Sequence, residues 1–211
     1  MMSQAYLGQP PRPAVWLINL FTAHENAESI LGDLLEEYSY LASKSGVTFA
    51  RRWYRRQTVK TIAHLFGSGY RAARWSTTAA AVGGFLLHRL VSGLPDKLLS
   101  AVTDRYLAFW STHLNAYLWV LKGMMPAHLI ASLCVGCVIA LAARGREMVT
   151  TVTLALVLCA LIGSAMVWVA THLPGGIVGM LWSFADPFAI VVGGAIVRTR
   201  RSAAITLAGQ V

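Results

Sequence analysis

VTTVTLALVLCALIGSAMVWVA, residues 149–170, is a run of 22 residues without a charged side chain. A helix rises about 1.5 Å per residue, so a helix of this length crosses the roughly 30 Å hydrocarbon core of a bilayer. Such an uncharged run predicts a membrane-spanning helix. We therefore place the chain among the integral membrane proteins and consider the rest of the sequence around this span.

The overall composition indicates the same class. Hydrophobic residues make up 56% of the chain and charged residues only 13%, whereas soluble domains carry about 25% charge. The formal net charge is +9. A basic excess can serve nucleic acid, anionic lipid or the cytoplasmic loops beside membrane spans, and the apolar run favours the loops. We expect no nucleic-acid partner.

Three further apolar stretches accompany this run. Residues 77–94 and 127–143 precede it, and residues 176–197 follow it. The expected fold class is an all-α membrane protein, in which a cytoplasmic helical hairpin leads into a four-helix transmembrane bundle. The expected boundaries are 1–75 for the hairpin, 76–201 for the bundle and 202–211 for a cytoplasmic tail.

An aromatic stretch, residues 106–121, lies before the second predicted span. Tyr and Trp side chains favour the boundary between membrane and water. The sequence leaves open whether this stretch forms a separate interfacial helix or a long lead-in to the span.

The basic residues orient the predicted spans. The segments before the first span, between the second and third, and after the fourth hold most of the Lys and Arg, whereas the opposite loops hold only Lys97, Arg105 and Lys122. Cytoplasmic loops carry the excess of Lys and Arg. We expect a multi-pass protein of the plasma (inner) membrane with both termini in the cytoplasm.

The predicted hairpin combines an acidic helix with a basic one. Asn26 can cap a helix that runs to about Lys44, Gly46 can end it, and a second helix extends to about Phe66. Arginine with Trp and Tyr suits contact with anionic headgroups. The arginines either hold the acidic helix or leave it free to dock a partner. The predicted surface for partner or lipid comprises Asp33, Glu36, Glu37, Arg51, Arg52, Trp53, Tyr54, Arg55 and Arg56.

Several short motifs of this region occur together in a known family. They are Pro10-Pro11, Leu31-Gly32-Asp33-Leu34 with Glu36-Glu37, Ala50-Arg51-Arg52-Trp53-Tyr54, and Gln57. With them, residues 10–66 resemble the permease prefix domain (type 2). That domain precedes duplicated orphan permeases, which are similar to the permease subunits of macrolide-exporter-type ABC systems. The resemblance implies association with such systems. It does not imply permease activity, because the long permease with large extracytoplasmic domains is replaced here by a short bundle.

Asp186 is the most informative single residue. It falls near the middle of the fourth predicted span, where a carboxylate costs about 2.5–3.5 kcal/mol on insertion scales, so it is a candidate functional site. Its expected partners are His88 and Arg89 in the first span. In the alternative interpretation, Asp186 and Pro187 begin a helix and the acid acts as a cap. The histidines show no metal-ligand spacing, and we identify neither a metal site nor catalytic residues.

Cysteine and glycine motifs inside the spans favour packing. Cys134 and Cys137 form a C-x-x-C pair, which occurs in redox and metal sites, but no second ligand pair accompanies it. Small residues let membrane helices approach closely. We therefore interpret this pair, Gly83-Gly84 and Gly193-Gly194 as helix contacts.

Two functions are consistent with this organisation. The first is a non-enzymatic accessory or partner-binding component, without a cofactor, whose expected partner is an ABC-type permease or ATPase. The second is a small oligomeric transporter or channel that uses Asp186. Association with further copies of the chain stays open in either case.

Overall fold

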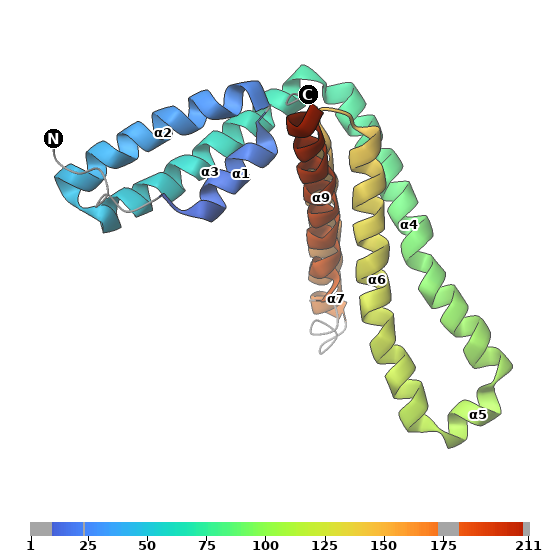
Figure 1. Ribbon diagram of the computed structural model, residues 1–211. Coiled ribbons are helices and arrows are strands. Elements are labelled where there is room, and N and C mark those ends of the chain that lie inside the picture. Colours follow the sequence, from blue (N-terminus) through green and yellow to red (C-terminus); the bar gives the residue numbers. More distant parts are fainter. Residues whose placement is uncertain (1–9, 23, 173–181, 209–211) are drawn as a thin grey trace. The chain divides into compact units, whose positions relative to one another are not determined.

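The computed structural model describes residues 10–22, 24–172 and 182–208, and all regular elements in these ranges are helical (Figure 1). The all-α prediction is therefore confirmed. The chain divides into two compact units, residues 1–74 with 202–211, and residues 75–201.

The first unit contains α1 (Arg12–Phe21), α2 (His24–Ser45) and α3 (Val47–Ala72). Pro13 lies in the first turn of α1, where a missing backbone N–H has no effect. Gly46 joins α2 to α3 with a φ of +88°, a conformation that glycine adopts without a steric penalty. The predicted cap is wrong in one detail: α2 begins before Asn26, which lies inside its first turn.

An apolar core holds these three helices together. Ile18 of α1 packs with Leu34 and Tyr38 of α2 and with Tyr54 of α3. The two tyrosine rings meet edge to face, with 5.7 Å between their centroids, a favoured aromatic geometry. Burial raises the pKa of Tyr54, because the ionised phenolate would lose its hydration. Tyr54 thus belongs to the core and not to the surface on which the sequence placed it.

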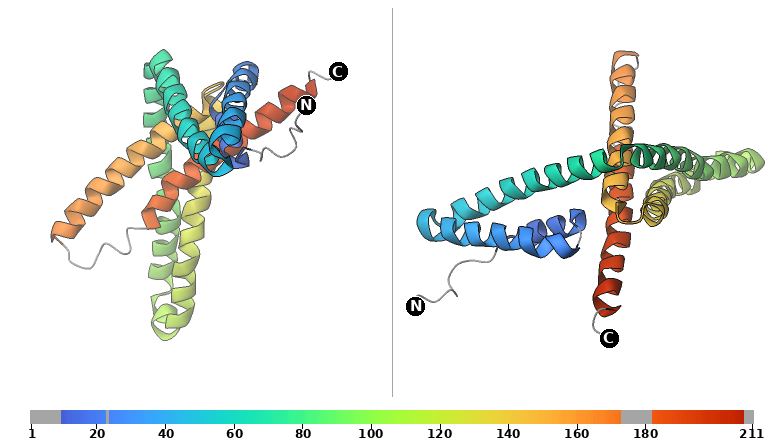
Figure 2. Two further views of the ribbon diagram at one scale, coloured as in Figure 1. Left: turned by 90° about the vertical axis from the view of Figure 1, so that its left-hand side faces the viewer. Right: turned by 90° about the horizontal axis from the view of Figure 1, so that it is seen from above.

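The second unit begins with a long helix, α4 (Arg74–Arg105), followed by α5 (Leu107–Thr112) and α6 (Leu114–Ala142). Figures 1 and 2 show α4 and α6 running alongside each other from the α5 turn. The aromatic stretch is thus divided between a short separate helix and the start of α6. The α4 helix continues beyond residue 94, where the first predicted span ends, and it includes Pro95, whose ring removes only one helical hydrogen bond.

The rest of the second unit consists of α7 (Glu147–His172), a short 3-10 turn at Trp182–Phe184, and α9 (Ala185–Ala208) as far as Arg201. Residues 173–181, which include the start of the predicted fourth span, lie outside the described residues. A shared core joins four helices: Ala81 of α4, Val135 and Ile139 of α6, Leu154 and Leu158 of α7, and Ile190 of α9.

Among the described helices, α7 is the one that is long and apolar enough to cross a membrane, and the apolar part of α6, Pro126–Ala142, is shorter. Length and composition thus indicate one candidate span, where the sequence predicted four. The α4 stretch is less apolar because it contains many Ala, Gly and Thr residues and because it includes His88 and Arg89.

Glycines set the distance between α6 and α9. A Cβ atom on Gly136 of α6 would lie 2.8 Å from Cα of Ile190, and one on Gly193 of α9 would lie 2.9 Å from the backbone N of Cys137. The helix backbones therefore touch where glycine leaves room. A Cβ on Gly194 would lie 2.8 Å from Cγ2 of Thr151, which brings α7 into the same contact. The predicted packing role is confirmed for Gly193 and Gly194.

The two residues of the Gly83-Gly84 pair differ in their surroundings. A Cβ on Gly84 would lie 2.9 Å from Cδ2 of Leu154, whereas one on Gly83 would meet nothing within 4 Å. Packing is therefore confirmed for Gly84 and is wrong for Gly83, which lies on the exposed face of α4.

We predict that Gly136→Ala lowers the free energy of unfolding by about 1–3 kcal/mol, the usual cost of overpacking. The added methyl group meets backbone, which cannot rotate away. Unfolding of the purified protein in mixed micelles, followed by circular dichroism, measures the change. Gly83→Ala is the matched control and should leave stability unchanged or slightly higher. Equal effects of the two changes would contradict the close approach of α6 and α9.

Candidate functional site

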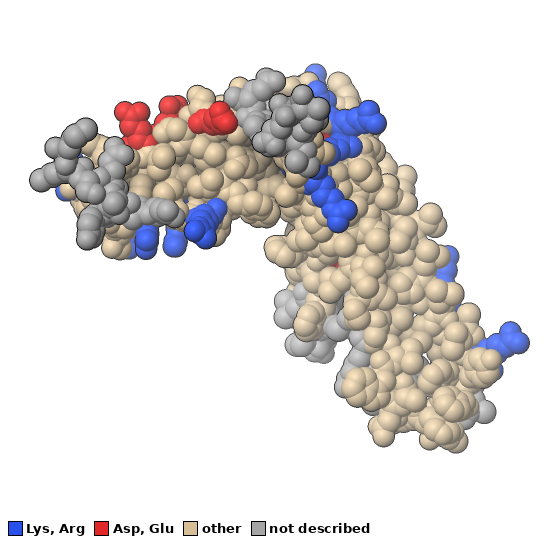
Figure 3. All heavy atoms as spheres, in the orientation of Figure 1, with Lys and Arg blue, Asp and Glu red and all other residues tan. Residues whose placement is uncertain are grey.

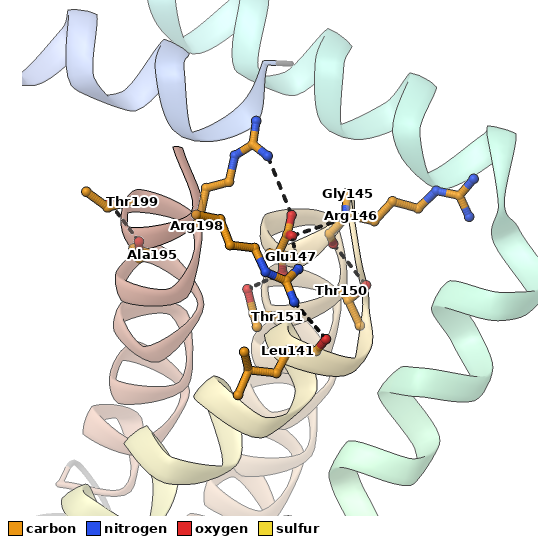
Figure 4. Close-up of polar contacts among 10 residues, drawn as sticks. Leu141, Gly145, Arg146, Glu147, Thr150, Thr151, Ala195, Arg198 and Thr199 are labelled. Carbon is orange, nitrogen blue, oxygen red and sulfur yellow. Dashed lines mark hydrogen bonds and ion pairs between the residues drawn. The ribbon is translucent and has the colours of Figure 1, made fainter. Parts of the chain in front are cut away.

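One end of the second unit is organised around the carboxylate of Glu147 (Figure 4). Glu147 is the first residue of α7, and its side chain is only 3% exposed. Oε1 accepts a hydrogen bond from Arg201, and Nη1 of Arg198 lies 3.7 Å from Oε2. The backbone N–H of Gly145 donates to Oε1 at 3.0 Å. The buried acid thus has both charge partners and a hydrogen-bond donor, the condition under which a buried ion is tolerated.

The same arginine extends the network to α6. Nη2 of Arg201 donates to the backbone carbonyl of Leu141 at 3.0 Å, which satisfies one of the free carbonyls at the end of that helix. Arg146, in the turn between α6 and α7, donates from Nη1 to Oγ of Ser76 in α4 at 3.2 Å. Contacts at this end therefore join all four long helices of the unit.

Glu147 is not among the site residues predicted from the sequence, in which the arginines of this segment serve only as topological signals. The signal was available: Glu147 is the one acidic residue between Asp104 and Asp186, and it directly follows Arg144-Gly145-Arg146. A lone acid within a basic segment at the start of an apolar helix indicates an ion pair.

Asp186 occupies the first turn of α9 and not the middle of a continuous helix. Pro187 explains this position, because proline is tolerated in the first turn, where no intrahelical N–H donor is needed. Oγ of Ser132 in α6 donates to Oδ1 of Asp186 at 3.0 Å. The half-buried carboxylate also lines a cavity of about 220 Å³ together with His128 and Trp182.

Neither predicted partner of Asp186 forms a hydrogen bond or an ion pair with it among the described residues. His88 is 7% exposed, and its Nδ1 has no hydrogen-bond partner among the described residues. Arg89 is exposed on α4, and no ion pair in the described part of the chain joins it to Asp186. The side chain that does contact Asp186, Ser132, was not predicted. A serine within an apolar stretch gives little signal in a sequence.

A further polar contact within the second unit joins α4 to α6. Nε2 of His128 lies 3.3 Å from Oδ1 of Asp96. The Asp96 side chain is 68% exposed, so this pair contributes little to stability.

The predicted surface of the first unit is largely exposed. The acids Asp33, Glu36 and Glu37 are exposed on α2, the four arginines at positions 51, 52, 55 and 56 are exposed on α3, and Trp53 is half-buried. Figure 3 shows acidic side chains along one edge of this unit and basic side chains along the opposite edge. No ion pair joins α2 to α3 among the described residues. The alternative in which the arginines hold the acidic helix is therefore wrong, since the apolar core holds it.

A groove of about 500 Å³ opens between α2 and α3. Its apolar floor includes Ile30, Leu34 and Leu65, and its polar lining includes Glu37 and His64. The groove lies within the unit and is accessible from outside.

One cysteine of the C-x-x-C pair, Cys137, takes part in helix packing. Sγ of Cys137 donates to the backbone carbonyl of Gly193 at 3.6 Å, while Cys134 is exposed. Among the described residues, no three His, Cys, Asp or Glu side chains group as metal ligands. The chain matches no protein-family model, no curated protein and no solved structure.

We predict that Glu147→Ala destabilises the second unit by about 3–5 kcal/mol, because it leaves two partly buried guanidinium groups without their counter-charge. Unfolding in mixed micelles measures the loss. Arg200→Ala, which removes an exposed arginine of the same helix, is the matched control and should stay within about 0.5 kcal/mol of the parent protein. If both changes have the same effect, Glu147 does not hold the helix ends together.

Proposed function

We propose that the chain is a non-enzymatic, multi-span protein of the inner membrane that uses its N-terminal helical unit to bind a partner. The partner belongs to an ABC-type permease system, as a permease or an ATPase. The chain acts as an accessory component, and the first unit is its docking element. This assignment combines the resemblance of residues 10–66 with the exposure of the charged side chains in that unit.

The docking role is supported by the contrast between the buried apolar core of the first unit and its exposed charged side chains. Its three helices are held by apolar side chains around Ile18 and Tyr54. The acids of α2 and the arginines of α3 are exposed, and in the described part of the unit they form no ion pairs with one another. Surface charges of this kind contribute little to folding but strongly to recognition. The acidic edge is suited to a basic partner surface, and the arginine edge to anionic headgroups.

The contacts within the second unit support several crossings. The α6–α7 turn and the Arg198–Arg201 segment of α9 meet at Glu147, next to the start of α4. The α5 turn joins α4 to α6, and Asp96 in the second half of α4 contacts His128 near the middle of α6. Successive helices that reverse direction in this way are arranged to cross one membrane repeatedly. The arginine-rich end then faces the cytoplasm.

This orientation predicts the location of reporter fusions. A reporter enzyme that is active only outside the cytoplasm should be active when fused after Ser100, and inactive when fused after Gly145 or at the C-terminus. Enzyme activity normalised to protein amount measures the location. Activity after Gly145 would reverse the orientation, and inactivity after Ser100 would contradict the first crossing.

The docking proposal predicts a specific loss of partner. Affinity capture of the tagged protein from gently solubilised native membranes, followed by mass spectrometry, should recover an ABC-type permease or ATPase. Deleting residues 1–66 should abolish recovery. Glu36→Lys should reduce it by reversing a charge on the acidic edge, whereas the matched control Glu36→Asp should retain it. Recovery of the protein alone, or only with further copies of itself, would contradict the proposal.

One observation favours the second candidate, a small transporter or channel. The carboxylate of Asp186 lines a cavity close to the start of α9, with the buried ring of His88 on a neighbouring helix. Acids at membrane depth often mark pathways for ions or substrates. This candidate requires Asp186 to be essential, whereas the docking function depends on the first unit.

A further inference from the structure

The cavity beside Asp186 is lined by charged, apolar and aromatic side chains. One carboxylate borders it, Leu129 and Ala185 supply apolar surface, and Trp182 supplies an aromatic side chain. His128 and Ser183 complete the lining. A volume of about 220 Å³ accommodates a small organic molecule, and pockets with mostly apolar walls and one charged group are typical of small-molecule sites.

Among the described residues, no cationic side chain forms an ion pair with the carboxylate of Asp186. The carboxylate accepts a hydrogen bond from the neutral hydroxyl of Ser132. The ring of His128, which also lines the cavity, contacts Asp96 instead. A half-buried carboxylate without a cation is energetically unfavourable, and a bound cation would remove that cost.

The other residues that line the cavity indicate which kind of cation it can bind. Magnesium and calcium require six or more oxygen ligands, and this cavity offers one carboxylate and few other oxygens. An aromatic face attracts organic cations, most strongly when they are partly desolvated. We propose that the cavity binds a small organic cation, such as a protonated amine, with Asp186 as its counter-ion and Trp182 as the aromatic wall. The proposal does not depend on the docking function of the first unit.

Calorimetric titration of the full-length protein in lipid nanodiscs tests this site with a matched pair of probes. Benzylamine is a cation at neutral pH, and benzyl alcohol is an uncharged molecule of similar size. We expect benzylamine to bind at least about tenfold more tightly than benzyl alcohol, as a charge-assisted contact implies. Equal affinities, or no saturable binding of benzylamine, would overturn the proposal.

Two substitutions assign the binding to the cavity. Asp186→Asn keeps the side-chain shape and the acceptor for Ser132 but removes the charge, so it should abolish the preference for benzylamine. Trp182→Leu should weaken benzylamine binding about threefold, the range of an exposed cation–π contact. Asp104→Asn, which changes an exposed acid outside the cavity, should bind like the parent protein. Unchanged binding by both cavity variants would exclude this location.

Discussion

The packing of the second unit depends on a carboxylate that is buried where three helix ends converge. An acid with 3% exposure is stable only if opposite charges accompany it. Arg198 and Arg201 provide them from α9, and Gly145 adds a backbone donor. Burying Glu147 therefore requires α9 to stay beside the α6–α7 turn. The geometry of the unit follows from satisfying this charge.

Charge and close packing act together at this end. Thr151, one turn after Glu147, donates its hydroxyl hydrogen to the carbonyl of Glu147 at 2.9 Å. Its methyl group faces Gly194 of α9. The absence of a side chain on Gly194 brings α9 close enough for its arginines to reach the acid. Polar contacts of buried threonines with their own helix also leave fewer groups that need external partners.

A structural feature could be predicted from the sequence when the residues that form it are close together in the chain. The two helices on either side of Gly46 could be predicted because local periodicity and turn chemistry determine them. The packing role of Gly193 was predictable from its apolar surroundings. The Glu147 network could not be placed in the same way, because residues 147 and 201 meet only after α7 and α9 fold back on each other. The contact of Ser132 with Asp186 is equally non-local.

Two predictions were wrong because residues adjacent in a helix were assigned to the same face. Arg89 follows His88 directly, yet one side chain is exposed and the other is buried, because successive residues of a helix point about 100° apart. For the same reason Tyr54, which lies among surface arginines in the sequence, faces the core.

The contact of Gly136 with the backbone of Ile190 also bears on how this sequence can diverge. A clash between two side chains can be relieved in evolution by shrinking one of them. A clash between a side chain and a main chain has no such remedy, since every residue carries the same backbone. Gly136 should therefore stay glycine in descendants that keep this helix crossing, whatever ligand or partner they acquire. Invariance at this position would record the geometry of the crossing and would not mark a site of chemistry.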